Sequence, residues 1–233
     1  MHRSKLYREQ AKGLDATARF TIKEALAMLK AMPAVKFDQT VEAAFRLGVD
    51  PRKSDQNVRG AVALPAGTGK LVRVAVVADG AQADAARAEG AEFVGYEDIV
   101  EKIKGGWQDF DVLIATSEAM KLVRPLGRQL GPRGLMPNPK TGTVTDNVGP
   151  AVRESKAGRV EFRADKGGCV HVPFGKLSFA AEALETNLAV IIDALRKAKP
   201  VSSKGTYMLG CTLSATMTPG VKLNLKELAG AVE

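Results

Sequence analysis

The stretch PAGTGKLVRVAVVADGAQADAARAE, residues 65–89, decides the fold class. Its glycine-rich start, residues 65–70, allows backbone conformations closed to other residues and suggests a hinge or a domain boundary. The near-continuous apolar run 71–78 is typical of a buried strand, and the Ala-rich segment 81–89 predicts a helix. A second buried-strand run follows at 111–115. This alternation predicts an open α/β domain whose sheet is at least partly parallel.

The segments before and after this alternation have the pattern of a second, α+β domain. Alternating polar and apolar residues predict strands over 41–47, 58–64, 160–163, 169–174 and 207–213. Helical spacing predicts a helix over 5–32 with a break at Gly13, and another over 178–199. Ser178 can cap the second helix, whose expected buried stripe is Leu184, Leu188, Ile191 and Leu195. Gly158 should end a short helix at 151–156, and it could be the return partner of the first hinge.

The net charge of +8, from 34 Lys plus Arg against 26 Asp plus Glu, suggests an anionic partner. Between residues 67 and 159 the two signs nearly balance, at 13 against 12, so the remaining segments carry 21 against 14. If the two outer thirds fold together, the partner should dock chiefly on that joint domain. Aromatic residues make up only 5% of the chain, which argues against stacking many single-stranded bases on rings.

Several classes of protein are disfavoured by what the sequence contains. Its two cysteines, Cys169 and Cys211, form neither a disulfide framework nor a zinc cluster, and they suggest a reducing compartment. The first residues are basic without the apolar core of a secretory signal, and apolar stretches such as 188–195 are too short to span a membrane. His171 alternates with apolar neighbours and is expected on the surface. We therefore expect a cytosolic protein with no membrane partner and no metal site.

The motifs of nucleotide enzymes are incomplete. Gly67-Thr68-Gly69-Lys70 resembles part of a phosphate loop, but Leu64 stands where that motif needs Gly, and Leu71 where it needs Ser or Thr. The segment also leads into a strand, whereas a phosphate loop opens a helix. No G-x-G-x-x-G or G-x-S-x-G occurs in the sequence. We expect no catalytic residues and no cofactor; the rival hypothesis is an α/β enzyme acting on a nucleotide or another anionic substrate.

A basic segment interrupts the α/β alternation. Residues 121–143 are rich in Gly and Pro and predict a shaped loop. Five cations and no acid lie within twenty of its residues: Lys121, Arg124, Arg128, Arg133 and Lys140. Such a loop could contact phosphates or remain solvated, and the pattern does not choose between the two. The G-x-x-G spacing of residues 131–134 matches a KH loop only weakly, because a proline-rich stretch follows where a helix is needed.

Two polar or aromatic features on the predicted strands have alternative interpretations. Phe37 precedes the first strand in phase with Val41, so its pattern favours a core residue over a nucleic-acid contact. Thr212, Ser214 and Thr216 form a row of hydroxyls on one strand face. Such a row can bond ribose 2′-OH groups in a shallow minor groove, or it can be a plain solvated face, which the pattern slightly favours.

Longer motifs carry a resemblance that covers essentially the whole chain. KFDQTVE (36–42), LGVDPRKSDQNVRG (47–60), LGRQLGPRGLMPNPK (126–140), RADK (163–166) and TM (216–217) resemble segments of the bacterial large-subunit ribosomal protein L-one family. That family implies an α/β fold with two domains. Residues 1–66 plus 160–233 would form a discontinuous α+β two-layer domain that binds rRNA, and residues 67–159 an inserted Rossmann-like domain between two hinges.

The resemblance also implies a function without enzymatic activity. Members of this family bind large-subunit rRNA at the mobile stalk beside the tRNA exit site and help deacylated tRNA to leave. Many of them also bind the mRNA leader of their own operon and repress its translation. The expected partners are therefore large-subunit rRNA, exit-site tRNA and the mRNA leader, and the expected location is the cytoplasm, on the ribosome. A non-specific basic protein would instead bind any RNA equally, with a steep salt dependence.

Carried over position by position, the family motifs assign roles to individual residues. Direct rRNA contacts are implied for Lys36, Phe37, Thr40, Glu42, Asp165, Lys166, Gly168, Thr216, Met217 and Thr218. A secondary RNA contact is expected from Arg124, Arg128, Arg133 and Lys140. Hinges are expected at Gly67, Gly69 and Gly158. Thr218 departs from the family, which usually has Gly there, and its Cβ at a close approach to RNA could shift the turn or weaken binding.

Overall fold

The computed structural model describes residues 3–15, 17–33 and 35–225. The chain divides into two compact units: one comprises the residues up to Gly69 and from Val160 onward, and the other is Lys70–Arg159. Both units mix helices and strands, which confirms the predicted α/β class. Within the described ranges, no helix is both long and apolar enough to cross a membrane.

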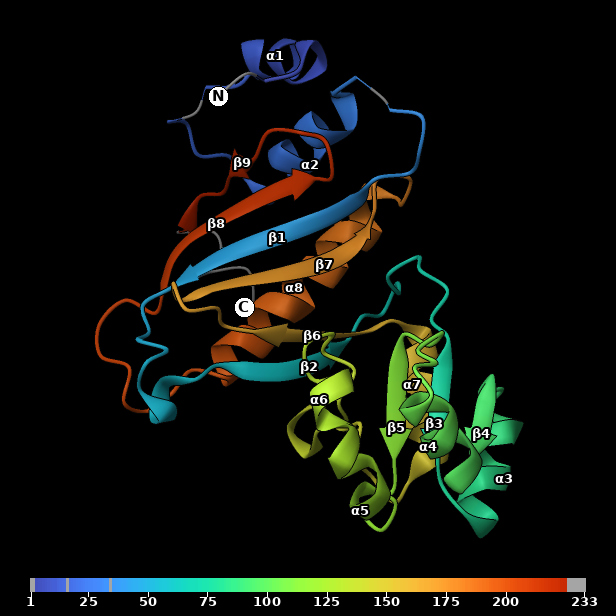
Figure 1. Ribbon diagram of the computed structural model, residues 1–233. Coiled ribbons are helices and arrows are strands. Elements are labelled where there is room, and N and C mark those ends of the chain that lie inside the picture. Colours follow the sequence, from blue (N-terminus) through green and yellow to red (C-terminus); the bar gives the residue numbers. More distant parts are fainter. Residues whose placement is uncertain (1–2, 16, 34, 226–233) are drawn as a thin grey trace. The chain divides into compact units, whose positions relative to one another are not determined.

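A four-stranded antiparallel sheet frames the first unit (Figure 1). The strands, in spatial order, are β7 (Cys169–Lys176), β1 (Thr40–Leu47), β8 (Met208–Ala215) and β9 (Val221–Lys222). Every second side chain of β1, from Val41 to Leu47, is buried and belongs to the core. This face of the sheet packs against α2 (Ile22–Ala31) and α8 (Ala181–Lys197). Because side chains alternate along a strand, the other face carries the polar residues.

The first unit also contains α1 (Lys5–Lys12), a 3-10 turn η1 (Ser54–Gln56) and a two-stranded sheet of β2 (Arg59–Ala63) and β6 (Arg159–Arg163). The predicted helix over 5–32 is therefore two helices, and residue 16 within it lies outside the described residues. The second helix begins where it does because Thr21 and Glu24 form a capping box.

The start of α8 differs from the prediction. Its N-cap is Ala180, and Ser178 lies before the helix, where its hydroxyl donates to Oδ2 of Asp38 at 2.7 Å. The backbone N–H of Ser178 also donates to Asp38, at 3.2 Å. Ser178 is thus engaged by the loop that precedes β1 and cannot cap α8. The predicted stripe along α8, from Leu184 to Leu195, is confirmed as fully buried.

The second unit is built on a parallel sheet of order β4-β3-β5, as the alternating pattern predicted. The strands are β3 (Val74–Val77), β4 (Phe93–Gly95) and β5 (Val112–Ala115). Helices cover both faces: α4 (Glu97–Lys104) on one, α3 (Gly80–Ala88) and α7 (Val148–Ala157) on the other. All four residues of β3 are buried, which explains its uninterrupted apolar sequence. Gly158 ends α7 as predicted, at φ +108°.

The predicted loop over 121–143 is wrong in its first half. Residues 120–130 are helical, as α5 (Met120–Val123), η2 (Arg124–Leu126) and α6 (Gly127–Leu130), and a 3-10 turn η3 (Pro139–Thr141) follows later. Val123, Leu126 and Leu130 recur at helical spacing and are buried in the core of the unit. Pro125 stands in the first turn of η2, where a helix tolerates proline.

Candidate nucleic-acid interface

Most of the predicted rRNA contacts lie at one end of the four-stranded sheet. In the sheet register Thr40 pairs with Lys176 of β7, and Val41 pairs with Ala215 of β8. Figure 1 shows the start of β1 at the same end of the sheet as the ends of β7 and β8. The segment 36–39 therefore leads into this end and the segment 216–218 leaves it. We call this end, with residues 36–40, Lys176 and 216–218, the proximal cluster.

Hydrogen bonds join the segments of the proximal cluster. The backbone N–H of Met217 donates to Oε1 of Gln39 at 2.8 Å, and Gln39 is itself only 2% exposed. The Thr216 hydroxyl donates to the carbonyl of Thr40 at 3.4 Å, and Lys176 Nζ donates to the Thr40 hydroxyl at 2.9 Å. Sequence reasoning missed Gln39, which lies just before β1 and whose partner Met217 is 178 residues away in the sequence.

The proximal cluster exposes two apolar side chains. Phe37 is 53% exposed and Met217 is 47% exposed. The pattern-based interpretation of Phe37 as a core residue is wrong, because β1 begins only at Thr40 and the alternation does not continue into the loop before it. Lys36 is exposed beside Phe37. The cluster thus presents an aromatic ring, a thioether, hydroxyls and cations, the groups that pack on bases and bond ribose and phosphate.

Thr218 is buried inside the turn after β8. Its hydroxyl accepts a hydrogen bond from the N–H of Ala215 at 2.8 Å and donates to the carbonyl of Ala215 at 3.3 Å. Its backbone is not in the left-handed region. The Thr218 side chain therefore closes the turn on itself, while the side chains of Thr216 and Met217 stay exposed.

Asp165, Lys166 and Gly168 lie at the opposite end of the sheet, in the turn between β6 and β7. The carbonyl of Gly168 accepts from the N–H of Leu47, the last residue of β1, at 2.9 Å. We call Asp165, Lys166 and Gly168 the distal cluster. From Thr40 to Leu47, β1 advances by seven residues at about 3.4 Å each, which places the distal cluster roughly 24 Å from the proximal cluster. The structure therefore does not bring the two groups of predicted contacts together at one point.

The distal turn is held by one carboxylate. Oδ1 of Asp165 accepts from the N–H groups of Cys169 and Gly167, both at 2.8 Å. The hydrogen bond from Cys169 is the main cause that holds the pKa of Asp165 below its usual value. Gly168 has φ +75°, and a Cβ there would lie 3.1 Å from the carbonyl oxygen of Val49. The side chain of Lys166 is left exposed at the turn.

The open face of the sheet connects the two clusters. Glu42, Ala44 and Arg46 of β1 point to this face, together with their register partners Ser214 and Thr212 on β8. Thr212 and Ser214 are half-buried, and Thr216 follows beyond the end of the strand. His171, opposite Ala44 on β7, is exposed as predicted. Among the described residues, no group of three or more His, Cys, Asp or Glu is placed to hold a metal ion.

The expected secondary contact lies on the second unit. Lys121, Arg124 and Arg128 are exposed and recur at helical spacing over the segment 120–130, opposite the buried Val123 and Leu130. Arg133 is exposed in the loop that follows, and Lys140 is exposed in η3. The four predicted residues thus include two on one helical stripe and two on the segment after it.

Comparison with known proteins agrees with the resemblance. The profile of the ribosomal protein L1p/L10e family matches residues 29–219, which include both clusters. The chain belongs to this family. It is also similar to the large ribosomal subunit protein uL1 of Saccharophagus degradans, with 56% identity over 226 residues that cover 97% of this chain and 96% of that protein. The resemblance inferred from the motifs is therefore confirmed.

In this L1p/L10e family member the first expected hinge is attached to the first unit. The side-chain amide of Asn187 in α8 donates to the carbonyl of Gly67 at 2.9 Å, and its oxygen accepts from the N–H of Ala66 at 3.0 Å. Gly67 and Gly69 both have positive φ, at 70° and 69°. A Cβ on Gly69 would lie 2.9 Å from the ring of Phe179. These glycines therefore follow the surface of the first unit closely.

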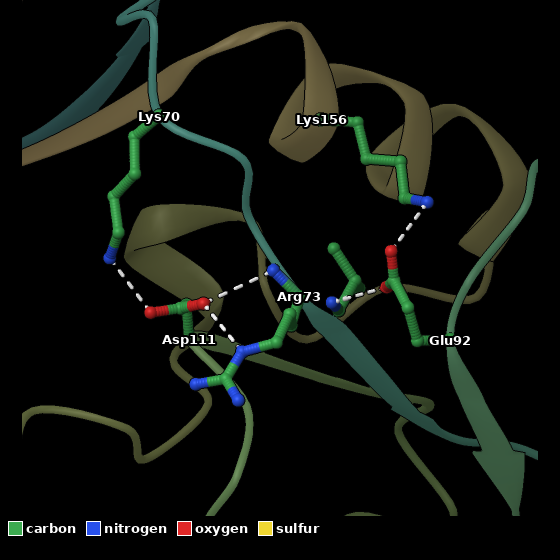
Figure 2. A network of polar contacts seen from close by, with 6 residues as sticks. Lys70, Arg73, Glu92, Asp111 and Lys156 are labelled. Carbon is green, nitrogen blue, oxygen red and sulfur yellow. Dashed lines mark hydrogen bonds and ion pairs between the residues drawn. The ribbon is translucent and has the colours of Figure 1, made fainter.

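The segment just after these glycines is attached to the second unit (Figure 2). Asp111 accepts from Lys70 Nζ at 2.7 Å and from both the backbone N–H and the Nε of Arg73, each at 3.2 Å. The Lys70 ammonium is the main cause that lowers the pKa of Asp111 to about 2. Glu92 accepts from the N–H of Val74 at 2.7 Å and pairs with Lys156. Between Lys70 and Arg73, the side chain of Leu71 is 95% exposed.

Proposed function

We propose that this chain is a structural constituent of the large ribosomal subunit that binds rRNA directly at the mobile stalk. The observation that carries the proposal is the proximal cluster, where the apolar side chains of Phe37 and Met217 are exposed next to hydroxyls and cations. Buried Gln39 holds the Met217 backbone, so the exposure is built into the fold. Family membership and the name of the uL1 relative support the large subunit as the assembly.

The proposed recognition reads the shape of a folded RNA. Phe37 and Met217 pack on riboses or bases, and the hydroxyls of Thr40 and Thr216 bond 2′-OH groups and base edges in a shallow minor groove. Glu42 accepts from base or ribose donors. At the distal cluster, the Asp165 turn orients Lys166 and the Gly168 backbone toward the RNA. Lys36 and Lys166 add affinity that falls with salt.

The same surface serves the regulatory part of the proposal. The chain assists release of tRNA from the exit site, and it represses its own operon by binding an mRNA leader that offers a similar fold. Because both RNAs use the proximal cluster, they compete for it. Free rRNA therefore relieves the repression.

The second unit supplies movement and a secondary contact. Residues 1–66 plus 160–233 form the main rRNA-binding domain, and residues 67–159 form the inserted domain. The inserted domain swings about the outgoing linker after Gly69 and the return at Gly158. The stripe with Arg124 and Arg128, and the following segment with Arg133 and Lys140, then contact tRNA or neighbouring RNA phosphates. The chain acts in the cytoplasm, bound to the ribosome.

The proposal is tested by measuring the affinity for the stalk-base fragment of large-subunit rRNA. The same measurement is made with scrambled RNA of equal length, and both RNAs are measured across a salt series. Thr216→Val and Met217→Ala should each cost on the order of 1–3 kcal/mol on the correct fragment only. Val201→Ala is the matched control, because Val201 is an exposed apolar residue of the same unit outside both clusters. Equal affinity for both RNAs, unchanged in the two variants, would reduce the function to non-specific binding by basic charge.

A further inference from the structure

The open face of the sheet contains a hollow that the proposed site does not use. Its volume is about 400 Å³, and it is lined by residues of β1, β7, β8 and β9, of the loop before α2 and of the segment after β9. The hollow forms where the open face carries the small residues Ala44 and Gly210. A Cβ added at Gly210 would have only one heavy atom within 4 Å, the Cβ of Arg46 at 3.9 Å. Leu209 lines the hollow and is 45% exposed.

Three cations line this hollow, and the sheet register explains why they meet there. Arg46 of β1 lies on the open face opposite Gly210 of β8. Lys222 of β9 lies opposite Thr212 on the same face. The third cation, Arg19, comes from a segment far from both in the sequence.

Arg19 reaches the hollow because its segment extends the sheet beyond β9. Phe20 forms a parallel bridge with Leu223, its N–H donates to the carbonyl of Lys222 at 3.0 Å, and its carbonyl accepts from Asn224 at 2.9 Å. Phe20 and Leu223 pack toward the core. Since side chains alternate, the preceding residues Arg19 and Lys222 both point to the open face.

The chemistry of this hollow suits a polyanion with apolar parts. Arg19 and Arg46 offer planar, permanently charged forks, which bind phosphate well, and Lys222 adds a third positive charge. The hydroxyl of Thr212 and the side chain of Leu209 can meet a ribose. The nearby carboxylate of Asp15 accepts from the N–H and the hydroxyl of Thr17 at 2.8 and 2.7 Å. These hydrogen bonds are the main cause that lowers the pKa of Asp15, and the charge of Lys222 lowers it further, so an RNA phosphate would share Lys222 with this carboxylate.

We propose that this hollow binds the sugar-phosphate backbone of the same RNA that occupies the proximal cluster, with its phosphates held by Arg19, Arg46 and Lys222. The inference rests on the proposed RNA-binding function. It adds a site whose contribution is electrostatic, whereas the proximal cluster supplies the recognition of shape. The two contributions can therefore be separated by their dependence on salt.

The test uses the full chain and the rRNA stalk-base fragment. The triple variant Arg19→Gln, Arg46→Gln, Lys222→Gln should lower the slope of log affinity against log salt by about 2–3, at 0.7–0.9 per phosphate contact. Affinity at 0.1 M salt should fall by about 100- to 500-fold, because the two lines should converge near 1 M salt, one decade higher. The control is Arg87→Gln, Lys102→Gln, Lys104→Gln, which removes the same charge from exposed positions on α3 and α4.

A second measurement probes the hollow chemically. Cys169 lines the hollow and is half-exposed, whereas Cys211 is buried and its pKa is raised to about 12 by burial. A maleimide should therefore label Cys169 in the native chain, and saturating rRNA fragment should slow that labelling at least fivefold. Because the N–H of Cys169 is also bonded to Asp165 of the distal cluster, the protection should be much smaller in the triple variant at saturating RNA. Inorganic phosphate or a free mononucleotide at the same phosphate concentration should give no protection, which separates an RNA backbone from a free anion.

The outcomes distinguish this inference from the function on which it rests. Suppose that the triple variant of the hollow has the same RNA affinity and the same salt slope as the control triple variant, and that RNA leaves the labelling of Cys169 unchanged. If Met217→Ala still loses RNA binding, these results overturn the hollow proposal and the proposed function stands. If the wild-type chain does not prefer the stalk-base fragment to scrambled RNA, the proposed function fails first. Equal loss at every salt concentration would indicate damage to the sheet and would also overturn the hollow site.

Discussion

Asn187→Ala should lower the free energy of unfolding of the first unit by about 2.5 kcal/mol. Asn187 is fully buried in the middle of α8, and its amide makes three hydrogen bonds to backbone groups. It accepts from the N–H of Ala66 at 3.0 Å and donates to the carbonyls of Gly67 and Phe174 at 2.9 and 2.8 Å. At about 1 kcal/mol for each lost bond the cost is about 3 kcal/mol, and the better helix propensity of Ala returns about 0.6 kcal/mol.

Urea unfolding followed by circular dichroism measures this loss, and hydrogen exchange of the amides at 66–69 locates it. Thr186→Ala is the matched control, because Thr186 neighbours Asn187 on the exposed side of α8 and its hydroxyl bonds only within the helix, to the carbonyl of Glu182. We expect the control to stay within 0.5 kcal/mol of wild type. The reasoning would be refuted if Asn187→Ala were equally close to wild type, or if exchange at 66–69 did not accelerate, since Gly67 would then not depend on α8.

Three further predictions concern the linker and the two clusters. Because the pKa of Asp111 is lowered from 3.8 to about 2 in the fold, its contribution to stability is complete above pH 3.8 and is lost as pH falls toward 2; Asp111→Asn should remove on the order of 1–2 kcal/mol of that pH dependence in acid titrations. Gly168→Ala should lower the free energy of unfolding by about 2–3 kcal/mol, which is more than Gly205→Ala should cost. Both glycines have positive φ, but only at Gly168 would the new Cβ lie against backbone oxygens. Equal melting temperatures of the two variants would contradict this prediction. Thr218→Val should cost about 1–2 kcal/mol and Thr218→Ser much less in urea unfolding, because only the hydroxyl pairs with Ala215.

The sequence predicted the parts of the fold that depend on local periodicity. The parallel sheet of the second unit was predictable because β3 is buried on both faces, and the stripe of α8 was predictable because it faces a single core. The segment 120–130 was mistaken for a loop because Gly and Pro were counted by type. Their positions mattered more: Pro125 lies in a first helical turn, and the apolar residues keep helical spacing.

The residues of the candidate site could be identified only in part. The motifs pointed to Phe37 and Met217, whereas the period of β1 pointed Phe37 to the core, because a pattern does not say where strand pairing begins. Ser178 looked like a helix cap, but its partner Asp38 is 140 residues away. Gln39 and Asn187 hold the site and the linker through contacts with residues 178 and 120 positions away in the sequence. Such contacts depend on tertiary structure, and no local signal contains them.

The separation of the two clusters constrains how RNA can lie on this protein. If one RNA touches both Met217 and Lys166, it must run along β1 for roughly 24 Å, over the open face of the sheet. That path passes the small residues Ala44 and Gly210 and the cations beside them. A flat face of large side chains would hold the backbone away from the strand, whereas a hollow lined by Arg19, Arg46 and Lys222 draws it in. The electrostatic site and the shape-reading site are therefore expected to act on one continuous RNA surface. Removing the cations of the hollow should reduce the affinity for an RNA that spans both clusters much more than the affinity for a short RNA that reaches only the proximal cluster.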